Sequence, residues 1–427
     1  MLEYKVWRGV LGVDDLTIIE RVDFDEVADA VVVHVHPDRR RKSRCGRCGQ
    51  PAPGYDQGEG RRRWRAVDLG PVQALVEAEA PRVNCPTHGP TVREVPWARH
   101  AVGHTRAFDD TVAWLVLQCS KSAVGQLMRV AWHTVGSILT RVGADIDASV
   151  DRFAGLRRIG IDEISYKRGH RYLTVVIDHD SGRLVWAAAG RDDATLHGFF
   201  DLLGPERCGA ITHVSADGAP WIERVVRKRC PQALVCADAF HVVRWAGEAL
   251  DAVRRQVWNE AAGRKRAQPG ASRFDRKDGT GEAQKLKRAR FALWKNYEDL
   301  TDHQHQQLDW ITTSHPSLWR GYLLKEGLRY VFAVKGEEGK EALDHWLAWA
   351  QRSRLPAFVE LGRKIKLHRP AIDAALDSGL SNARTESTNT KIRLLTRIAF
   401  GFHSAEPLIA LAMLSLGGHR PALPGRG

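Results

Sequence analysis

Three acidic residues in the second half of the chain stand where they could bind metal ions. Asp162 and Asp217 each end a short apolar run, and Glu386 lies in a late segment with helical spacing. Carboxylate oxygens suit Mg²⁺, and Mn²⁺ can replace it. Two divalent ions about 3.5–4 Å apart assist the in-line cutting and joining of phosphodiesters. If the fold brings these acids together, they predict a site for that chemistry.

A single acid at the end of a strand has a simpler explanation, because such residues often serve only solubility. Asp162 by itself would therefore decide nothing. Its neighbour Glu163 should point the opposite way, since successive side chains alternate along a strand. The hypothesis depends on whether the other acids join Asp162.

A second group of residues could bind zinc. Cys45 and Cys48 form a CxxC pair, and Cys85 and His88 form a CxxH pair farther along the chain. Three thiolates and an imidazole suit tetrahedral Zn²⁺, and four protein ligands indicate a structural site. The alternative is that Cys85 and His88 are only a loop pair. Seven cysteines, an odd number, also argue against a disulfide framework.

The charge of the chain indicates an anionic partner. The formal net charge is +13 and the pI is near 9.6, although basic proteins without nucleic-acid partners are common. A basic run between the two ligand pairs could follow phosphates and stack on bases. It comprises Arg61, Arg62, Arg63, Trp64 and Arg65. Solvated arginines on a β-ribbon are the alternative.

Residues 106–143 have helical spacing, with apolar positions that fit three short helices. The link 128–135 has the length of a turn that leads into a recognition helix. Four residues would then face the major groove: Trp132, His133, Thr134 and Ser137. Three-helix bundles that bind nothing share this apolar pattern, so that alternative stays open.

The elements around the acids have the order of an RNase H-like core. The expected elements are strands at 158–162, 172–178 and 183–190, a helix at 192–203, a strand at 211–218, a helix at 221–229 and a strand at 233–241. In that α/β fold, a mixed sheet flanked by helices, the first and fourth strands lie side by side. Asp162 and Asp217 should therefore be neighbours.

The third acid should come from a late helix. Glu386, Asn389, Thr390 and Arg393 share one helical face by the i, i+3, i+4, i+7 rule. Asn389 would orient the metal environment. Lys391 or Arg393 would hold DNA phosphate.

The remaining segments complete the predicted organisation. Residues 4–35 are expected to form strands, 261–284 a flexible basic loop, and 286–380 helices whose aromatic residues pack in a core. The alternative is that one or two of these aromatic residues stack on unpaired bases. No apolar run reaches the ~18 residues of a membrane helix, and the first residues do not resemble a signal peptide, so a soluble cytoplasmic protein is expected. The expected domains are a β-rich zinc module (1–100), a helix-turn-helix (101–150), the first part of the core (151–260), a helical insertion (261–380) and the end of the core (381–427).

Taken together, these motifs resemble the ISL-three family of DDE transposases from bacterial insertion sequences. The match rests on both ligand pairs, the helix-turn-helix, and the strings at 160–163, 215–217, 238–241, 381–389 and 399–402. The resemblance implies Asp162, Asp217 and Glu386 as the metal-binding triad. It also implies an all-helical insertion between the fifth strand and the final helix. Strand order favours Asp217 over Asp238 as the second ligand, which leaves Asp238 and His241 to position a ligand, water or the DNA end.

The expected function is DNA transposition. The enzyme would bind the terminal inverted repeats of its element as double-stranded DNA, hydrolyse a phosphodiester with water, and join a 3′-hydroxyl to target DNA. Joining two ends calls for at least a homodimer, working at the bacterial nucleoid in the cytoplasm. One alternative is a domesticated DNA-binding regulator that no longer cuts. Another is a resolvase or nuclease on the same fold, which would release cut ends without joining them to a target.

Overall fold

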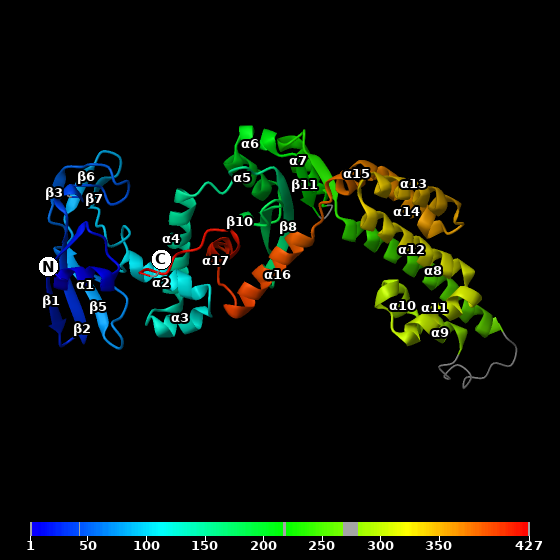
Figure 1. The fold of residues 1–427 in the computed structure, drawn as a ribbon, viewed down its shortest axis with the longest axis horizontal. Coiled ribbons are helices and arrows are strands. Elements are labelled where there is room, and N and C mark those ends of the chain that lie inside the picture. The colour runs from blue at the N-terminus through cyan, green and yellow to red at the C-terminus, as the bar shows by residue number, and fades with distance from the viewer. Residues whose placement is uncertain (1, 42, 217–218, 268–280, 426–427) are drawn as a thin grey trace.

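The computed structural model describes residues 2–41, 43–216, 219–267 and 281–425. Three parts follow one another along its long axis (Figure 1). A β-rich part contains the amino terminus, an α/β part with a three-helix unit occupies the middle, and a helical part lies at the far end. Within the described residues, no helix is long and apolar enough to cross a membrane.

The β-rich part contains two sheets. The first has the order β1-β2-β5-β4, and the second has the order β3-β6-β7. Their strands are β1 (Thr17–Asp25), β2 (Ala30–Pro37), β3 (Gly54–Asp56), β4 (Arg61–Arg65), β5 (Gln73–Glu79), β6 (Arg82–Cys85) and β7 (Gly89–Val92), with a 3-10 turn η1 (Arg39–Arg41). Trp64 and Trp97 pack edge to face in the core of the first sheet, with ring centroids 5.5 Å apart. The second sheet carries two of the predicted zinc ligands, because Cys85 ends β6 and His88 directly precedes β7.

The prediction of strands from residue 4 onward is wrong at its start. Residues Leu2–Leu11 form helix α1. Among the residues of α1, only Trp7 and Leu11 contact the core of the first sheet. The apolar face of this helix is therefore narrow. Tyr4, Val6 and Val10 are exposed, which hides the helical period in the sequence.

The three helices predicted after residue 105 are present as α2 (Arg106–Val116), α3 (Lys121–Leu127) and α4 (Trp132–Ser149). Thr105 and Ser120 cap the first two, because their hydroxyls accept from the backbone N–H groups of Phe108 and Ala123. The three helices share one hydrophobic cluster with strands β8–β10 and with the last two helices of the chain. They are therefore joined to the central sheet through a common core.

The central sheet has the order β10-β9-β8-β11-β12, in which the first and fourth strands, β8 and β11, lie side by side as predicted. Its strands are β8 (Arg158–Lys167), β9 (Arg171–Asp178), β10 (Leu184–Ala189), β11 (His213–Ala216) and β12 (Leu234–Ala237). Strand β11 runs parallel to β8 and β12, whereas β9 and β10 are antiparallel to their neighbours. Helices α5 (Asp193–Leu203), α6 (Pro205–Ala210) and α7 (Pro220–Arg229) cover one face. Helices α16 (Ala383–Ile398) and α17 (Glu406–Leu416) cover the other.

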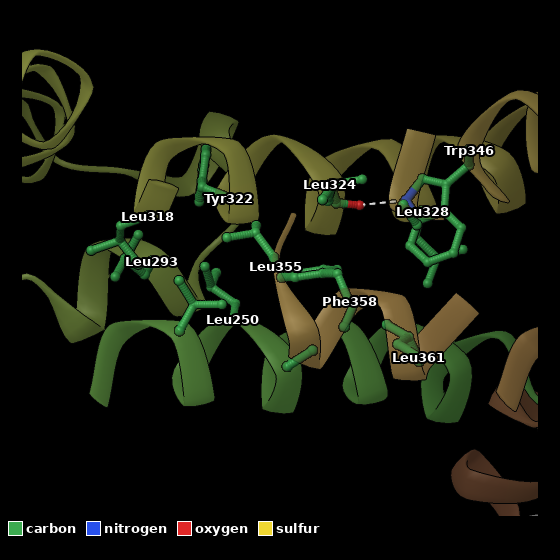
Figure 2. Packing of buried hydrophobic residues seen from close by; sticks show 14 of the residues in the cluster. Leu250, Leu293, Leu318, Tyr322, Leu324, Leu328, Trp346, Leu355, Phe358 and Leu361 are labelled. Carbon is green, nitrogen blue, oxygen red and sulfur yellow. Dashed lines mark hydrogen bonds between the residues drawn. The ribbon is translucent and has the colours of Figure 1, made fainter. Parts of the chain in front are cut away.

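The described residues of the far part form helices without strands, which confirms the predicted all-helical insertion. It contains α8 (Ala239–Ala267), α9 (Glu282–Arg288), α10 (Arg290–Trp294), η2 (Tyr297–Asp299), α11 (Asp302–Ser314), α12 (Pro316–Val334), α13 (Gly336–Arg352), α14 (Pro356–Leu367) and α15 (Arg369–Ser378). Figure 2 shows Leu250, Tyr322 and Phe358 packed between these helices. The indole of Trp346 donates a hydrogen bond of 2.7 Å to the carbonyl of Leu324, so its buried N–H is satisfied.

Three details of the insertion differ from expectation. The predicted boundary at 260 divides α8, a single helix of 29 residues that packs within the insertion. Both ends of the predicted basic loop are helical, and its residues 268–280 lie outside the described residues. Trp294 and Tyr297, expected in the core, are 51% and 55% exposed.

Candidate functional site

Asp162 lies on the face of β8 that α16 covers. Ile159 and Ile161 point into the cluster beneath α5–α7, and Ile164 points into the cluster beneath α16 and α17. By the alternation of a strand, Asp162 shares the face of Ile164. The side-chain amide of Asn389 on α16 donates a hydrogen bond of 2.7 Å to Asp162 Oδ2. This contact joins the first strand of the sheet to the late helix.

The amino-terminal end of α16 packs directly on β8. A Cβ atom at Gly160 would lie 2.6 Å from Thr385 Oγ1 and 2.9 Å from His179 Nε2, closer than Cβ atoms approach other groups. Thr385 therefore lies over Gly160, while Asn389 lies over Asp162, two residues farther along the strand. Helix α16 thus runs in the same direction as β8 and close to it.

Glu386 lies on α16 one turn before Asn389 and is exposed to solvent. Thr385, Thr388, Asn389 and Ile392 form the buried face of the helix. Glu386 follows Thr385 directly and therefore sits at the edge of that face. On the neighbouring strand, β11 ends at Ala216, which pairs with Ile161. Asp217, the next residue in the chain, lies outside the described residues.

Asp238 connects the starts of two helices. It is 4% exposed, and its Oδ2 lies 2.7 Å from His241 Nδ1. Its Oδ1 accepts hydrogen bonds from the backbone N–H of Phe240, on α8, and of Asn382, which precedes α16. These contacts use both carboxylate oxygens, so Asp238 fixes α8 against the helix that carries Glu386.

The described residues also place buried oxygen atoms along the inner side of α16. Asn382 Oδ1, Thr385 Oγ1 and Asn389 Oδ1 have no hydrogen-bond partner within the described part of the chain. Buried oxygens are normally satisfied by protein, water or an ion. With the Asp162 carboxylate beside Asn389, they form an oxygen-only environment, which is the kind that Mg²⁺ takes together with water. The residues present therefore fit a hydrated divalent cation.

Glu163 points to the opposite side of the sheet, as predicted. Its Oε1 accepts a hydrogen bond of 2.9 Å from the indole of Trp221 on α7, and its Oε2 lies 2.5 Å from Arg191. Glu163 thus stabilises the packing of α7 on the sheet, away from Asn389.

Three residues near Asp162 were not identified from the sequence. His179 Nε2 and Ser215 Oγ lie 2.7 Å apart in the interior, and Arg384 donates to the carbonyls of His179 and Asp180. Burial and the nearby guanidinium groups of Arg384 and Arg158 lower the pKa of His179 to about 4, so its imidazole is neutral at pH 7. Ser215 pairs with Gly160 of β8, two residues before Asp162, and its place in the string 215–217 was the signal available in the sequence.

The four predicted zinc ligands come together. The ligand atoms of Cys45, Cys48, Cys85 and His88 all lie within 4.8 Å of one another. Burial raises the pKa of the Cys85 thiol, but the backbone N–H of Thr87 and the imidazole of His88 outweigh it and lower that pKa to about 6. A thiolate is the form that binds Zn²⁺. The arrangement matches a structural Cys₃His site.

The basic run on β4 differs from expectation in one respect. Trp64 is 2% exposed and packs on Trp97, so it cannot stack on a base. Because side chains alternate, Arg61 and Arg63 lie on the other face, where both donate to Glu77 of β5. Arg65 pairs with Asp68. Arg62 donates to the carbonyl of Val102 and lies over the Trp64 ring.

The residues expected to read DNA lie at the start of α4. His133 and Ser137 are exposed and Thr134 is half-buried. Trp132 instead packs edge to face on His403, and the ammonium of Lys121 lies 3.4 Å from the centroid of its ring. Lys391 and Arg393 are exposed on α16.

Comparison with known families agrees with this geometry. The family model of ISL3 DDE transposases, described as "Transposase", matches residues 159–412. A model described as "Helix-turn-helix domain of transposase family ISL3" matches residues 93–143. A model described as "zinc-finger of transposase IS204/IS1001/IS1096/IS1165" matches residues 41–88. The three matches follow the order of the three structural units.

Individual relatives are similar over most of their length. The transposase for insertion sequence element IS1557 of Mycobacterium tuberculosis is 62% identical over 436 residues, which cover 100% of this chain and 98% of the relative. The transposase for insertion sequence element IS1001 of Bordetella parapertussis is 26% identical over 322 residues, or 74% of this chain and 75% of the relative. With the catalytic family model spanning more than half of its length, this chain belongs to the ISL3 family of insertion-sequence transposases and is a DDE transposase with a zinc ribbon and a helix-turn-helix domain.

Proposed function

We propose that this transposase binds the terminal inverted repeats of its element and carries out Mg²⁺-dependent DNA hydrolysis and strand transfer, with Asp162, Asp217 and Glu386 as the carboxylate ligands. The observation that supports this most is the 2.7 Å hydrogen bond between Asn389 and Asp162. It holds the helix that carries Glu386 against the strand that carries Asp162. Asp217 follows Ala216, whose partner Ile161 directly precedes Asp162.

Bound divalent ions would supply positive charge at the scissile phosphate and a more acidic oxygen nucleophile. The side chains have separate tasks in this proposal. Asp162, Asp217 and Glu386 would hold the cations, and Asn389 fixes the orientation of the Asp162 carboxylate. Asp238 and His241 keep the starts of α8 and α16 in place. The attacking oxygen belongs to water in the cutting step and to the DNA 3′-hydroxyl in the joining step.

DNA would run along the exposed basic side chains of the middle part. Lys391 and Arg393 would contact phosphate beside the site, and His133, Thr134 and Ser137 would enter the major groove from α4. Zinc would stabilise the amino-terminal module, where Arg61, Arg62, Arg63 and Arg65 contribute positive potential. Two chains would hold the two ends of the element. The domain limits would follow the prediction, except that the insertion would begin at α8.

A cleavage assay tests the proposal. A labelled duplex that carries an element end is incubated with Mg²⁺ or Mn²⁺ and with Asp162→Asn, Asp217→Asn or Glu386→Gln. Each change should reduce cleavage at least about 100-fold and leave duplex binding intact, because metal ions contribute several kcal/mol to such steps. Wild-type rates in all three variants would refute the assignment. Specific binding without cleavage by the wild-type protein would favour the DNA-binding regulator, and cut ends that never join target DNA would favour the nuclease.

A further inference from the structure

A groove of about 780 Å³ lies between α8, α10 and α12 of the insertion. Phe240, Arg244, Gly247, Asp251 and Arg255 line it from α8. These positions recur every three to four residues, so one face of α8 forms a wall about 20 Å long. Trp294 lies on the opposite side. The groove is within the size range of built ligand sites, about 300–1,000 Å³.

Two aromatic rings in the groove are open to solvent. Phe240 is 62% exposed and Trp294 is 51% exposed, whereas Tyr322 and Phe358 of the same insertion are fully buried. The guanidinium of Arg290 lies 5.4 Å from the centroid of the Trp294 ring. Exposed rings beside guanidinium groups are the arrangement on which unpaired bases stack.

Gly247 keeps the groove open. It lies inside α8, where glycine costs about 1 kcal/mol relative to alanine. A Cβ atom there would meet nothing within 4 Å, so no close packing requires glycine at this position. A larger residue would project into the groove. We therefore attribute the glycine at this position to the open volume of the groove, which a side chain would partly fill.

The charge of the groove favours an anion. Four cationic residues line it, Arg244, Arg255, Lys325 and Arg329, against two acids. Lys325 and Arg329 pair with Glu326 and Glu298, so the cations of α8 are the ones available to a ligand. Asp251 is balanced by Arg254 and Arg255, at 2.7 and 3.1 Å, and Glu248 lies 3.6 Å from Arg244. Arg244 and Arg255 still expose 51% and 65% of their side chains. Phosphate groups would find partners at both ends of the α8 face.

The groove begins at the candidate active site. Phe240 stands between Asp238 and His241, and its backbone N–H donates to Asp238. We propose that this groove binds single-stranded DNA at the cut end of the element, with unpaired bases stacked on Phe240 and Trp294 and phosphates near Arg244 and Arg255. This inference rests on the proposed function, because only a cut or unpaired end supplies single strands there.

Photo-crosslinking tests the location independently of the other DNA-binding surfaces. A short single-stranded oligonucleotide with 5-iodouracil is irradiated with the full-length Asp162→Asn protein without divalent metal, and crosslinked peptides are identified by mass spectrometry. Crosslinks at Phe240 and Trp294 are expected. Crosslinks confined to the zinc ribbon and helix-turn-helix would overturn the proposal. Since this assay needs no cleavage, it can succeed even where the assignment of the three acids fails.

Substitutions test the stacking and the space. Trp294→Ala should weaken binding of a fluorescein-labelled oligothymidylate roughly 5- to 150-fold, the equivalent of about 1–3 kcal/mol per stacked base. Trp294→Phe should restore much of it. Gly247→Leu should weaken binding while α8 gains helix propensity. Tyr330→Ala is the matched control, because Tyr330 is 61% exposed on α12 but does not line the groove. Equal affinity in Trp294→Ala, Gly247→Leu and wild type would overturn the proposal.

Discussion

Asp162 and Asn389 lie 2.7 Å apart although 227 positions separate them in the chain. The whole helical insertion stands between them in sequence and extends away from the central sheet in space (Figure 1). The contact is a hydrogen bond to a carboxylate, one of the stronger kinds in proteins. It therefore registers α16 against β8 without help from the insertion.

Removal of that hydrogen bond should affect catalysis more than folding. We expect Asn389→Ala to slow end cleavage about 10- to 100-fold, because hydrogen bonds to charged groups contribute about 1.5–3 kcal/mol. Asn389→Asp should be at least as harmful, since it places a second carboxylate beside Asp162. Cleavage rates at saturating DNA measure the effect. Thr390→Ala, at an exposed position of the same helix, is the control. Equal cleavage rates in Asn389→Ala and wild type would show that Asn389 does not orient the Asp162 carboxylate for catalysis.

The close approach at Gly160 gives a steric prediction. Gly160→Ala should push α16 away from β8, because the new methyl group would lie 2.6 Å from Thr385 Oγ1 and 2.9 Å from His179 Nε2. Overpacking of this kind costs about 1–3 kcal/mol. We expect a lower thermal midpoint and a large loss of cleavage. Gly198→Ala on α5, where a Cβ meets nothing within 4 Å, should leave both unchanged or slightly raise the midpoint. A fully active Gly160→Ala would contradict the packing.

Lys121 predicts a pH dependence of stability. Its side chain is 1% exposed and, within the described residues, its Nζ has no hydrogen-bond partner. Burial lowers its pKa from 10.5 to about 8. Between those pH values the unfolded chain holds a proton that the folded chain lacks, so stability should rise as pH increases from about 8 to 10.5. The penalty for the charged form, present in full below pH 8, amounts to about 3 kcal/mol.

Lys121→Met isolates this group from others that titrate in the same range. The substitution keeps an unbranched chain between the rings of Trp132 and Phe402, which lie 3.4 and 5.2 Å from Nζ. The variant should be more stable than the wild type at pH 7 by up to about 3 kcal/mol, the penalty for the charged form, and the difference should shrink towards pH 10.5. Denaturant midpoints measure it, and a difference that grows with pH would show the wrong sign.

Zinc removal should unfold the sheet β3-β6-β7. The cluster beneath these strands has four buried hydrophobic residues among those described, too few for an independent core. A chelator, or Cys85→Ser, should speed hydrogen exchange of the backbone N–H groups of β6 and β7, while the first sheet keeps its protection because it has its own core. Cys119→Ser, outside the ligand group, should keep about one zinc per chain and the native exchange rates. Protection of β6 and β7 that survives complete zinc loss would contradict the structural role.

Patterns that repeat over a few residues were readable from the sequence. The apolar segments before Asp162 and Asp217, the spacing of Cys45 and Cys48, and the helical repeats of the insertion all depend on local periodicity. The predicted end of the first strand is wrong, because β8 continues to Lys167 and Asp162 lies within it. The opposite orientation of Asp162 and Glu163 on β8 was also predictable, because alternation is a property of the strand itself. Both features are confirmed except at Asp217, which lies outside the described residues.

Features set by distant contacts were not readable. The basic run predicted an exposed Trp64, but Trp64 packs on Trp97, 33 positions later in the chain, and is buried. Two hydrogen bonds also join segments that are far apart in the sequence. They link Asn389 to Asp162, and Arg384 to the carbonyl of His179, and no local repeat predicts either of them. Trp294 lies in a helical repeat like its buried neighbours. Its side chain stays exposed to solvent because α8 and α12 leave a groove beside it.

Iron-directed cleavage of the protein chain tests the central claim most directly. Fe²⁺ is loaded in place of Mg²⁺ in the full-length protein, and hydroxyl radicals produced with ascorbate and peroxide cut the backbone next to the bound metal. The account predicts cuts near Asp162 and Glu386 that Mg²⁺ suppresses, that Asp162→Asn abolishes, and that Glu163→Gln preserves because Glu163 binds Trp221 on the other face. Cuts that remain unchanged in Asp162→Asn, or that occur only at distant acids, would contradict a metal site between β8 and α16.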